Sequence, residues 1–275
     1  MKLTRTTKAI VTGAASGIGK ATALALAAKG VALWLVDIDA PGLDDTAEQV
    51  RALGVQAQTT ACDLLQAAAV DDLAAEILQR WPAPNLLVNS AGVGAYGPTH
   101  EMDAAAWARV LGINLLAPIR LTNALLPALT AQPEAHVVNL CSIFGLTAMP
   151  YIAPYQTSKF GLVGYSLALD AEYGRRAFGV TAVCPGIVRT PMIAALEITM
   201  ATSRLKIPSL IGITPELVAR RIVRAIERNS GLIVIAPSAR LGWLTMRLSP
   251  RLMRWLHRSG AISFGFLQRL PPPAR

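Results

Sequence analysis

Short apolar runs alternate with longer amphipathic stretches along the first 235 residues of the chain. The apolar runs predict strands at 8–12, 31–36, 55–60, 85–88, 136–141, 179–184 and 231–235. The stretches between them predict helices at 17–29, 43–53, 66–80, 103–127, 153–178 and 214–228. Apolar strands that alternate with helices are typical of a parallel sheet covered on both faces. We therefore expect an α/β fold with a single Rossmann-type, doubly wound parallel sheet of about seven strands.

The length of 275 residues suits one such domain, and no Gly/Ser-rich linker or internal repeat divides the chain. We predict a Rossmann-type domain at 1–235 and a separate tail at 236–275. The first strand begins within about eight residues of the start, which leaves no room for a signal peptide. No run of eighteen apolar residues occurs, so we expect no membrane span. The three cysteines, Cys62, Cys141 and Cys184, fall in or beside apolar strands, which favours a reducing, cytoplasmic compartment without disulfides.

The tail is strongly basic. Residues 236–275 hold seven Arg and no Asp or Glu, in a chain whose net charge is +9. Five arginines follow one helical stripe and four apolar side chains follow another: Arg240, Arg247, Arg251, Arg254 and Arg258, and Leu244, Leu248, Leu252 and Trp255. Ser249-Pro250 predicts the start of a second helix, so we expect helices at 238–248 and 250–258, followed by an apolar coil.

Two interpretations of this tail stay open. Basic amphipathic helices can lie on an anionic membrane surface, which would place the protein peripherally on the inner face of a membrane. The apolar stripe can equally pack over a substrate cleft or against another subunit. Nucleic-acid binding is disfavoured, because no recognised binding module surrounds the basic residues.

A glycine-rich turn links the first predicted strand to the first predicted helix. It reads Gly13-Ala-Ala-Ser16-Gly17-Ile18-Gly19. Glycines allow a tight turn and the close approach of a diphosphate, and the following helix offers its N–H groups to that anion. An ordinary strand-to-helix turn that merely needs glycine is the alternative. We expect a dinucleotide site here.

The second predicted strand ends at Asp37. A carboxylate at this place can accept hydrogen bonds from the adenosine ribose and would repel the 2′-phosphate of NADP. No Lys or Arg occurs at 38–42, and Ser16 in the glycine turn is not basic. The sequence therefore favours NAD over NADP. Asp37 could instead cap a helix or form a turn, since Asp39 and Pro41 mark a loop.

Tyr155 and Lys159 are four residues apart, which places them on one face of a predicted helix. A free tyrosine titrates near pH ~10 and is a poor base at neutral pH. A cation held beside the phenol would lower its pKa toward the working range. The Tyr/Lys pair alone is common on surface helices, but Ser142 lies thirteen residues upstream. The three side chains together predict a site of proton transfer.

These motifs occur in one order along the chain: Thr12-Gly13-xxx-Gly17-Ile18-Gly19, Asn89-Ser-Ala91-Gly92, Asn114, Ser142, Tyr155-xxx-Lys159 and Pro185-Gly186-Ile-Val-Arg-Thr190. Because of these motifs and their order, residues 5 to about 235 resemble the compact branch of the short-chain dehydrogenase/reductase family. One departure is Ser90, where the family usually has a second Asn. The resemblance implies the sheet order 3-2-1-4-5-6-7, an NAD(P) cofactor and a homodimer or homotetramer.

The resemblance also implies a role for each matching residue. Tyr155 would exchange a proton with the substrate oxygen, and Ser142 would hold that oxygen. Lys159 would lower the pKa of Tyr155 and bind the nicotinamide ribose, and Asn114 would bind a water that links Lys159 to solvent. The implied cofactor contacts are Gly13, Ser16, Gly17, Ile18, Gly19, Asp37, Asp63, Leu64, Asn89, Ala91, Gly92, Tyr155, Lys159, Pro185, Gly186, Val188 and Thr190. Asp63 could also cap the following helix.

We expect no metal, because the three histidines show no ligand spacing, and we expect His136, beside a buried strand, to be structural. Residues between Thr190 and Pro215 should form a mobile lid, and the apolar side chains near the site predict an apolar substrate. The leading hypothesis is an NAD-dependent oxidoreductase for apolar secondary alcohols or ketones of steroid, terpenoid, aromatic or long-chain type. The alternatives are an NADPH-dependent 3-oxoacyl-thioester reductase and a non-catalytic dinucleotide-binding protein of a membrane surface.

Overall fold

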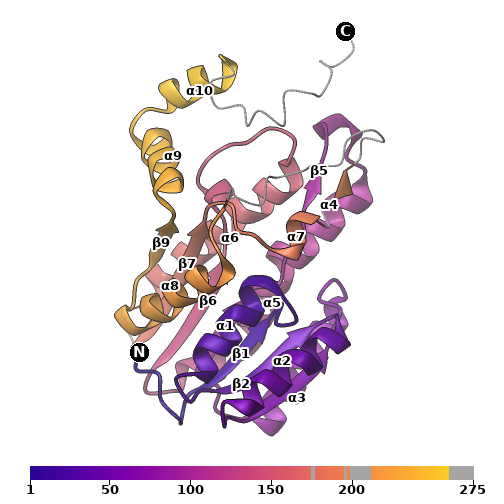
Figure 1. Cartoon of the computed structure of the whole chain (residues 1–275), viewed down its shortest axis with the longest axis vertical. Coiled ribbons are helices and arrows are strands. Elements are labelled where there is room, and N and C mark those ends of the chain that lie inside the picture. Colours follow the sequence, from indigo (N-terminus) through magenta and orange to yellow (C-terminus); the bar gives the residue numbers. More distant parts are fainter. Residues whose placement is uncertain (175–176, 195–196, 199–211, 260–275) are drawn as a thin grey trace.

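A central parallel sheet lies between two layers of helices (Figure 1). The computed structural model describes residues 1–174, 177–194, 197–198 and 212–259. The strands of the sheet are β1 (Lys8–Thr12), β2 (Ala32–Asp37), β3 (Ala57–Ala61), β4 (Leu86–Asn89), β6 (Ala135–Leu140), β7 (Phe178–Pro185) and β9 (Leu232–Ile235). Their order is β3-β2-β1-β4-β6-β7-β9, and all neighbours are parallel. The predicted doubly wound fold and strand order are confirmed.

The helices bury the two faces of this sheet. One layer contains α1 (Gly17–Ala27), α2 (Ala40–Ala52) and α8 (Pro215–Arg228), and the other contains α3 (Ala67–Arg80), α5 (Ala117–Thr130) and α6 (Ala153–Tyr173). Successive side chains along a strand point to opposite faces of the sheet, so Val11 packs against the first helix layer and Ile10 against the second. Because both faces are covered, the inner strands are buried and mostly apolar, and they occur as short apolar runs in the sequence. The edge strand β3 is only partly buried.

A few short elements differ from the prediction. β5 (Ala95–Tyr96) and β8 (Glu197–Ile198) pair in a second, two-stranded sheet, and α7 (Pro191–Ala194) begins the predicted lid. Two-residue strands have no periodic pattern, so the sequence could not reveal them. Most of the predicted lid lies outside the described residues.

The helix predicted at 103–127 is divided by a wider turn. α4 (Ala104–Leu111) leads into a π-turn at Gly112–Leu116, and α5 continues from there. Turns of this kind occur often at functional sites. This one carries Asn114.

By length and composition alone, the continuous helical stretch Ala104–Thr130 could cross a membrane. In the fold, however, Leu121, Leu125 and Leu129 of this stretch are at most 1% exposed and belong to the core under the sheet. Its apolar character therefore has a structural cause within the domain.

The tail forms the two helices that the sequence predicted, α9 (Pro237–Leu248) and α10 (Pro250–Arg258). Ser249 caps the second helix, its Oγ accepting a hydrogen bond from the Leu252 backbone N–H at 3.3 Å. Ala239 and Met253 face inward and are buried. The predicted stripe of Leu244, Leu248, Leu252 and Trp255 is exposed, so within one chain it does not pack over the cleft. The apolar coil predicted beyond it lies outside the described residues.

The chain's buried histidine and cysteines have structural surroundings. His136 is fully buried in β6, where its Nε2 shares a hydrogen bond of 2.8 Å with Thr181 Oγ1. Cys62, Cys141 and Cys184 are buried free thiols. In the described part of the chain, no group of three or more His, Cys, Asp or Glu could hold a metal ion.

Acid should destabilise the fold through His136. Burial lowers the pKa of this imidazole from 6.5 to about 3. Because the unfolded chain binds the proton first, the free energy of unfolding should fall by up to ~1.4 kcal/mol per pH unit as the pH drops from about 6.5 toward 3. Urea titrations across this range should show a flatter pH dependence for His136→Gln. The exposed His100 supplies the control His100→Gln, and an equal slope in all three proteins would contradict the assignment.

Candidate active site

A cavity of about 560 Å³ opens at the carboxyl ends of the strands, the edge where open α/β sheets bind ligands. All predicted site residues except Asn89 and Asn114 line it. They are Gly13, Ser16, Gly17, Ile18, Gly19, Asp37, Asp63, Leu64, Ala91, Gly92, Ser142, Tyr155, Lys159, Pro185, Gly186, Val188 and Thr190. Motifs distributed over most of the chain therefore meet at one place.

The glycine turn packs too tightly for side chains. Gly13 has a φ of +69°, and a Cβ atom on it would lie 2.8 Å from the Cα of Ala91. A Cβ on Gly19 would collide with the carbonyl oxygen of Gly13. α1 begins at Gly17, and its N-cap Ser16 makes no side-chain capping bond. The free N–H groups of the helix start and the glycine surface together fit a dinucleotide diphosphate.

Thr12 fixes the loop that follows β4, a role that the sequence analysis missed. Its Oγ1 accepts hydrogen bonds from the backbone N–H groups of Ser90 at 3.1 Å and Ala91 at 3.2 Å. The loop after β4 is thus tied directly to the end of β1. Thr12 belongs to the glycine motif, but the spacing of that motif gives no sign of this contact.

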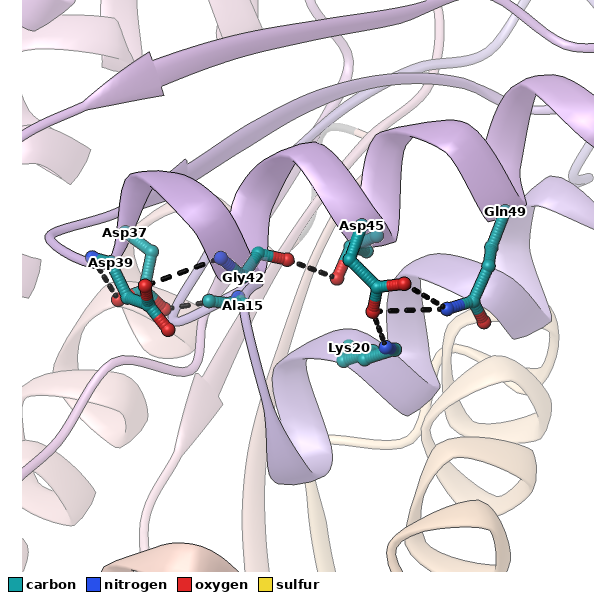
Figure 2. A network of polar contacts seen from close by, with 8 residues as sticks. Ala15, Lys20, Asp37, Asp39, Gly42, Asp45 and Gln49 are labelled. Atoms are coloured by element: carbon teal, nitrogen blue, oxygen red, sulfur yellow. Dashed lines mark hydrogen bonds and ion pairs between the residues drawn. The ribbon is translucent and has the colours of Figure 1, made fainter.

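Asp37 anchors the glycine turn to the end of β2. Its Oδ2 accepts a hydrogen bond of 3.0 Å from Ala15 N, and its Oδ1 accepts one of 3.2 Å from Asp39 N (Figure 2). Asp39, whose Oδ1 accepts from Gly42 N, caps α2, so the alternative capping role belongs to Asp39. Lys20, the nearby cation, pairs with Asp45 (Figure 2).

Asp63 stabilises a turn. The Asp63 Oδ1 accepts a hydrogen bond of 3.0 Å from Leu65 N, and the N-cap of α3 is Gln66. Asp63 therefore does not cap the helix. It lines the cavity. Thr190 lies over the glycine turn, since a Cβ on Gly17 would be 3.2 Å from Thr190 Cγ2.

Asn89 differs from its predicted position. Its side chain is 2% exposed and does not line the cavity. Its Nδ2 donates to Thr122 Oγ1 at 3.1 Å and to Asn139 Oδ1 at 2.8 Å, so it joins β4 to β6 and α5. As the last residue of β4 it faces the helix layer, and the chain reaches the cavity only at the next residue, Ser90.

Ser142, Tyr155 and Lys159 meet on one wall of the cavity. The Ser142 hydroxyl interacts with the Tyr155 phenol. Ser142 Oγ accepts a hydrogen bond from Phe144 N at 3.1 Å. Lys159 is 3% exposed, and its Nζ lies 5.7 Å from the centre of the Tyr155 ring. That Nζ donates a hydrogen bond of 2.6 Å to the carbonyl oxygen of Leu140.

The electrostatics of this cluster differ from the expectation. Burial raises the pKa of Tyr155, and the interaction with the Ser142 hydroxyl opposes that rise only in part. Burial also lowers the pKa of Lys159 to about 8. Loss of water disfavours the charged form of each group, and the ammonium is directed to the Leu140 carbonyl. The expectation that Lys159 lowers the Tyr155 pKa does not hold in this arrangement, where Tyr155 is a protonated phenol.

Asn114 positions the catalytic turn of α6. It is fully buried, its Oδ1 accepts from Val93 N at 2.8 Å, and its Nδ2 donates to Val93 O at 2.8 Å and to Ser158 Oγ at 3.2 Å. The hydroxyl of Ser158 in turn donates to the Tyr155 carbonyl at 2.6 Å. Ser158 was missed, although a polar residue between Tyr155 and Lys159 was a visible signal. The water-binding role of Asn114 stays a prediction.

Beyond Tyr155 the cavity is apolar. The residues that line this end include Tyr96, Phe144, Met149, Ile152 and Met192. Met149 is held by its backbone N–H, which donates to Gln156 Oε1 at 2.7 Å. Among the described residues that line the cavity, the charged ones are Asp37, Asp63 and Lys159, which all belong to the predicted dinucleotide and catalytic positions. The remaining end suits an apolar molecule.

Comparison with known proteins agrees with this geometry. Residues 7–201 match the short chain dehydrogenase family. A putative ketoacyl reductase of Streptomyces coelicolor is 35% identical over 191 residues, which cover 69% of this chain and 73% of the relative. A cyclohexanol dehydrogenase of Acinetobacter is 34% identical over 193 residues, 69% of this chain and 76% of the relative.

Solved structures with a similar fold contain either cofactor. A short-chain dehydrogenase/reductase from Burkholderia phymatum in complex with NAD superposes with a TM-score of 0.78 and 26% identity, covering 100% of this chain and 99% of that one. A single-residue variant of the actinorhodin polyketide ketoreductase with NADPH gives a TM-score of 0.77 and 28% identity, covering 86% of this chain and 99% of that one.

Proposed function

Because the chain belongs to the short-chain dehydrogenase/reductase family and is an NAD(P)-dependent oxidoreductase, we propose that it interconverts apolar secondary alcohols and ketones with NAD(H). The observation that carries this proposal is the cluster of Ser142, Tyr155 and Lys159 beside an otherwise apolar cavity end. Tyr96, Phe144 and Ile152 would contact a steroid-, terpenoid-, aromatic- or long-chain-type substrate.

Different residues of the cavity would bind the cofactor and transfer the proton. The glycine turn and α1 would hold the diphosphate, Asp37 the adenosine ribose, and Lys159 the nicotinamide ribose. The nicotinamide supplies the hydride for reduction and accepts it in oxidation. In reduction, the Ser142 and Tyr155 hydroxyls would donate hydrogen bonds to the carbonyl oxygen, and Tyr155 would give its proton as the carbon accepts hydride. The raised pKa of Tyr155 keeps that proton available at neutral pH.

Asp37 favours NAD(H) over NADP(H). Its carboxylate is fixed at the end of β2 by Ala15 N and Asp39 N. Among the described residues that line the cavity, Lys159 is the one cation, and it belongs to the catalytic cluster. An additional phosphate on the ribose would therefore meet a carboxylate without a neutralising partner.

Asp37→Ala should reduce the preference for NADH over NADPH. We expect wild-type kcat/KM for NADH to exceed that for NADPH by at least about tenfold, and Asp37→Ala to remove most of that difference. Asp44→Ala, which removes an exposed carboxylate of α2 outside the cavity, is the control and should keep the wild-type ratio. Wild-type preference for NADPH would refute the assignment.

A second candidate is an NADPH-dependent 3-oxoacyl-thioester reductase. The similarity to the putative ketoacyl reductase supports it. Initial rates with a panel of cyclic apolar ketones and with a 3-oxoacyl thioester separate the two candidates. Faster turnover of the ketones, with NADH, supports the leading proposal, and faster turnover of the thioester with NADPH supports the second.

We also propose a homo-oligomer formed through the helices that follow β4 and β6. Leu116 in the π-turn and Phe160 and Leu167 on α6 are large apolar side chains exposed in the single chain. A second copy that covers them would remove this apolar surface from water.

A further inference from the structure

The two C-terminal helices expose apolar side chains that the single chain leaves uncovered. Of the large hydrophobic side chains exposed in the described residues, about half lie on α9 and α10: Leu241, Leu244, Leu248, Leu252 and Trp255. Leu248 is 80% exposed. The opposite sides of the same helices bury Ala239 and Met253, so the helices are seated on the protein and these side chains point away from it. An apolar concentration of this kind marks an interaction site.

Arginines are interleaved with these apolar residues. Arg240, Arg247, Arg251, Arg254 and Arg258 are all exposed. No Asp or Glu occurs after Glu227, so the segment contains no carboxylate that could neutralise them. We call these five arginines and the five apolar residues above the tail surface.

The positive charge continues onto the neighbouring helix. Arg221, Arg224 and Arg228 of α8 and Arg240 of α9 line a second cavity of about 290 Å³. α8, α9 and α10, orange to yellow, follow one another along the same side of the molecule (Figure 1). Four guanidinium groups around one hollow can bind phosphate oxygens in bidentate fashion.

We propose that the tail surface docks on an anionic lipid bilayer. Its leucines and Trp255 enter the boundary between headgroups and acyl chains, and its arginines bind the lipid phosphates. An acidic protein would match the arginines alone, whereas apolar residues interleaved with them along two helices need an apolar medium beside the anionic groups. A bilayer surface supplies both within a few ångströms.

The tail lies next to the apolar end of the active-site cavity. His257 Nε2 is hydrogen-bonded to the Ala148 carbonyl at 3.1 Å, and the following residue, Met149, lines the cavity. Docking would therefore bring the cavity mouth close to the bilayer, where an apolar substrate is concentrated. This consequence rests on the proposed function, while the docking itself does not.

Vesicle flotation of the full chain tests the proposal. Vesicles of phosphatidylcholine alone are compared with vesicles in which about a third of the lipid is phosphatidylglycerol. We expect partitioning at least about tenfold stronger on the anionic vesicles, and weaker partitioning as salt is added. Equal or absent partitioning on the anionic vesicles would overturn the proposal.

Paired substitutions confine the test to the described helices. Leu244→Ser/Leu248→Ser and Arg247→Gln/Arg251→Gln should each lower partitioning by about tenfold. The controls Leu53→Ser, at a side chain 50% exposed beyond the end of α2, and Arg5→Gln should float as wild type. Binding to polyglutamate, a probe for acidic proteins, is measured in parallel. If the leucine variant floats as wild type and only the arginine variant binds polyglutamate more weakly, the tail surface binds an acidic protein and the proposal is wrong.

Activity in solution separates this proposal from the proposed function. Both double variants should turn over a water-soluble ketone as fast as wild type, because neither changes a residue that lines the active-site cavity. Flotation requires no turnover. An enzyme that reduces ketones but does not float refutes only the docking, and a protein that floats without turnover refutes only the proposed function.

Discussion

Tyr155→Phe should lower kcat by about 10³-fold while leaving the dissociation constant of NADH within about threefold of wild type. The phenol hydroxyl, which interacts with the Ser142 hydroxyl, is the group placed to exchange a proton with the substrate oxygen. Removing it leaves the ring, the glycine turn and Lys159 in place. Steady-state rates with an apolar ketone and a fluorescence titration with NADH measure the two effects separately.

Tyr165→Phe is the matched control for this substitution. Tyr165 lies on the same helix, α6, and its hydroxyl donates to Asn123 Oδ1 at 3.0 Å outside the cavity. We expect kcat within about twofold of wild type, because the change removes a single exposed hydrogen bond. Equal turnover by Tyr155→Phe and Tyr165→Phe would contradict the role given to Tyr155.

Gly19→Ala should weaken NADH binding by about a hundredfold and lower the free energy of unfolding by about 1–3 kcal/mol. The added Cβ would collide with the Gly13 carbonyl oxygen, which is backbone and cannot rotate away. The glycine turn must then move off the start of α1, where the diphosphate is expected to bind. Calorimetric titration with NADH and urea unfolding measure the two losses.

Gly242→Ala tests whether the effect comes from the close approach. In α9 an added Cβ would lie 3.9 Å from Thr147 Cγ2, an ordinary contact. Alanine is favoured over glycine inside a helix by about 0.5–1 kcal/mol, so this variant should be as stable as wild type or more so. It should bind NADH normally. Normal NADH binding by Gly19→Ala as well would show that the turn does not hold the diphosphate.

The sequence predicted the fold because the inner strands of the sheet are buried on both faces. Runs such as Lys8–Thr12 and Ala135–Leu140 are short, apolar and followed by amphipathic helices, a pattern that few architectures produce. The two-residue strands Ala95–Tyr96 and Glu197–Ile198 could not be predicted, because their pairing joins segments about a hundred residues apart. The π-turn at Gly112–Leu116 was hidden for a different reason: its residues continue the apolar helical pattern.

The site was predictable where chemistry fixes the residue type, and less so where direction or environment decides. The meeting of Ser142, Tyr155 and Lys159 followed from their motif. The direction of the Asn89 side chain did not follow from its motif. Successive residues at the end of a strand point to different sides, so Asn89 faces the helix layer while Ser90, the next residue, lines the cavity. The raised pKa of Tyr155 was also missed, because the sequence shows a neighbouring cation but does not show how much water burial removes.

Transfer of deuterium tests the central claim most directly. The full chain is incubated with an apolar cyclic ketone and with NADH that carries deuterium in both positions at carbon four of the nicotinamide, and the alcohol formed is analysed by mass spectrometry. We expect one deuterium on the carbinol carbon, with the rate of transfer lowered by about 10³-fold in Tyr155→Phe and kept in Tyr165→Phe. Alcohol without deuterium, or equal transfer by both variants, would contradict this claim.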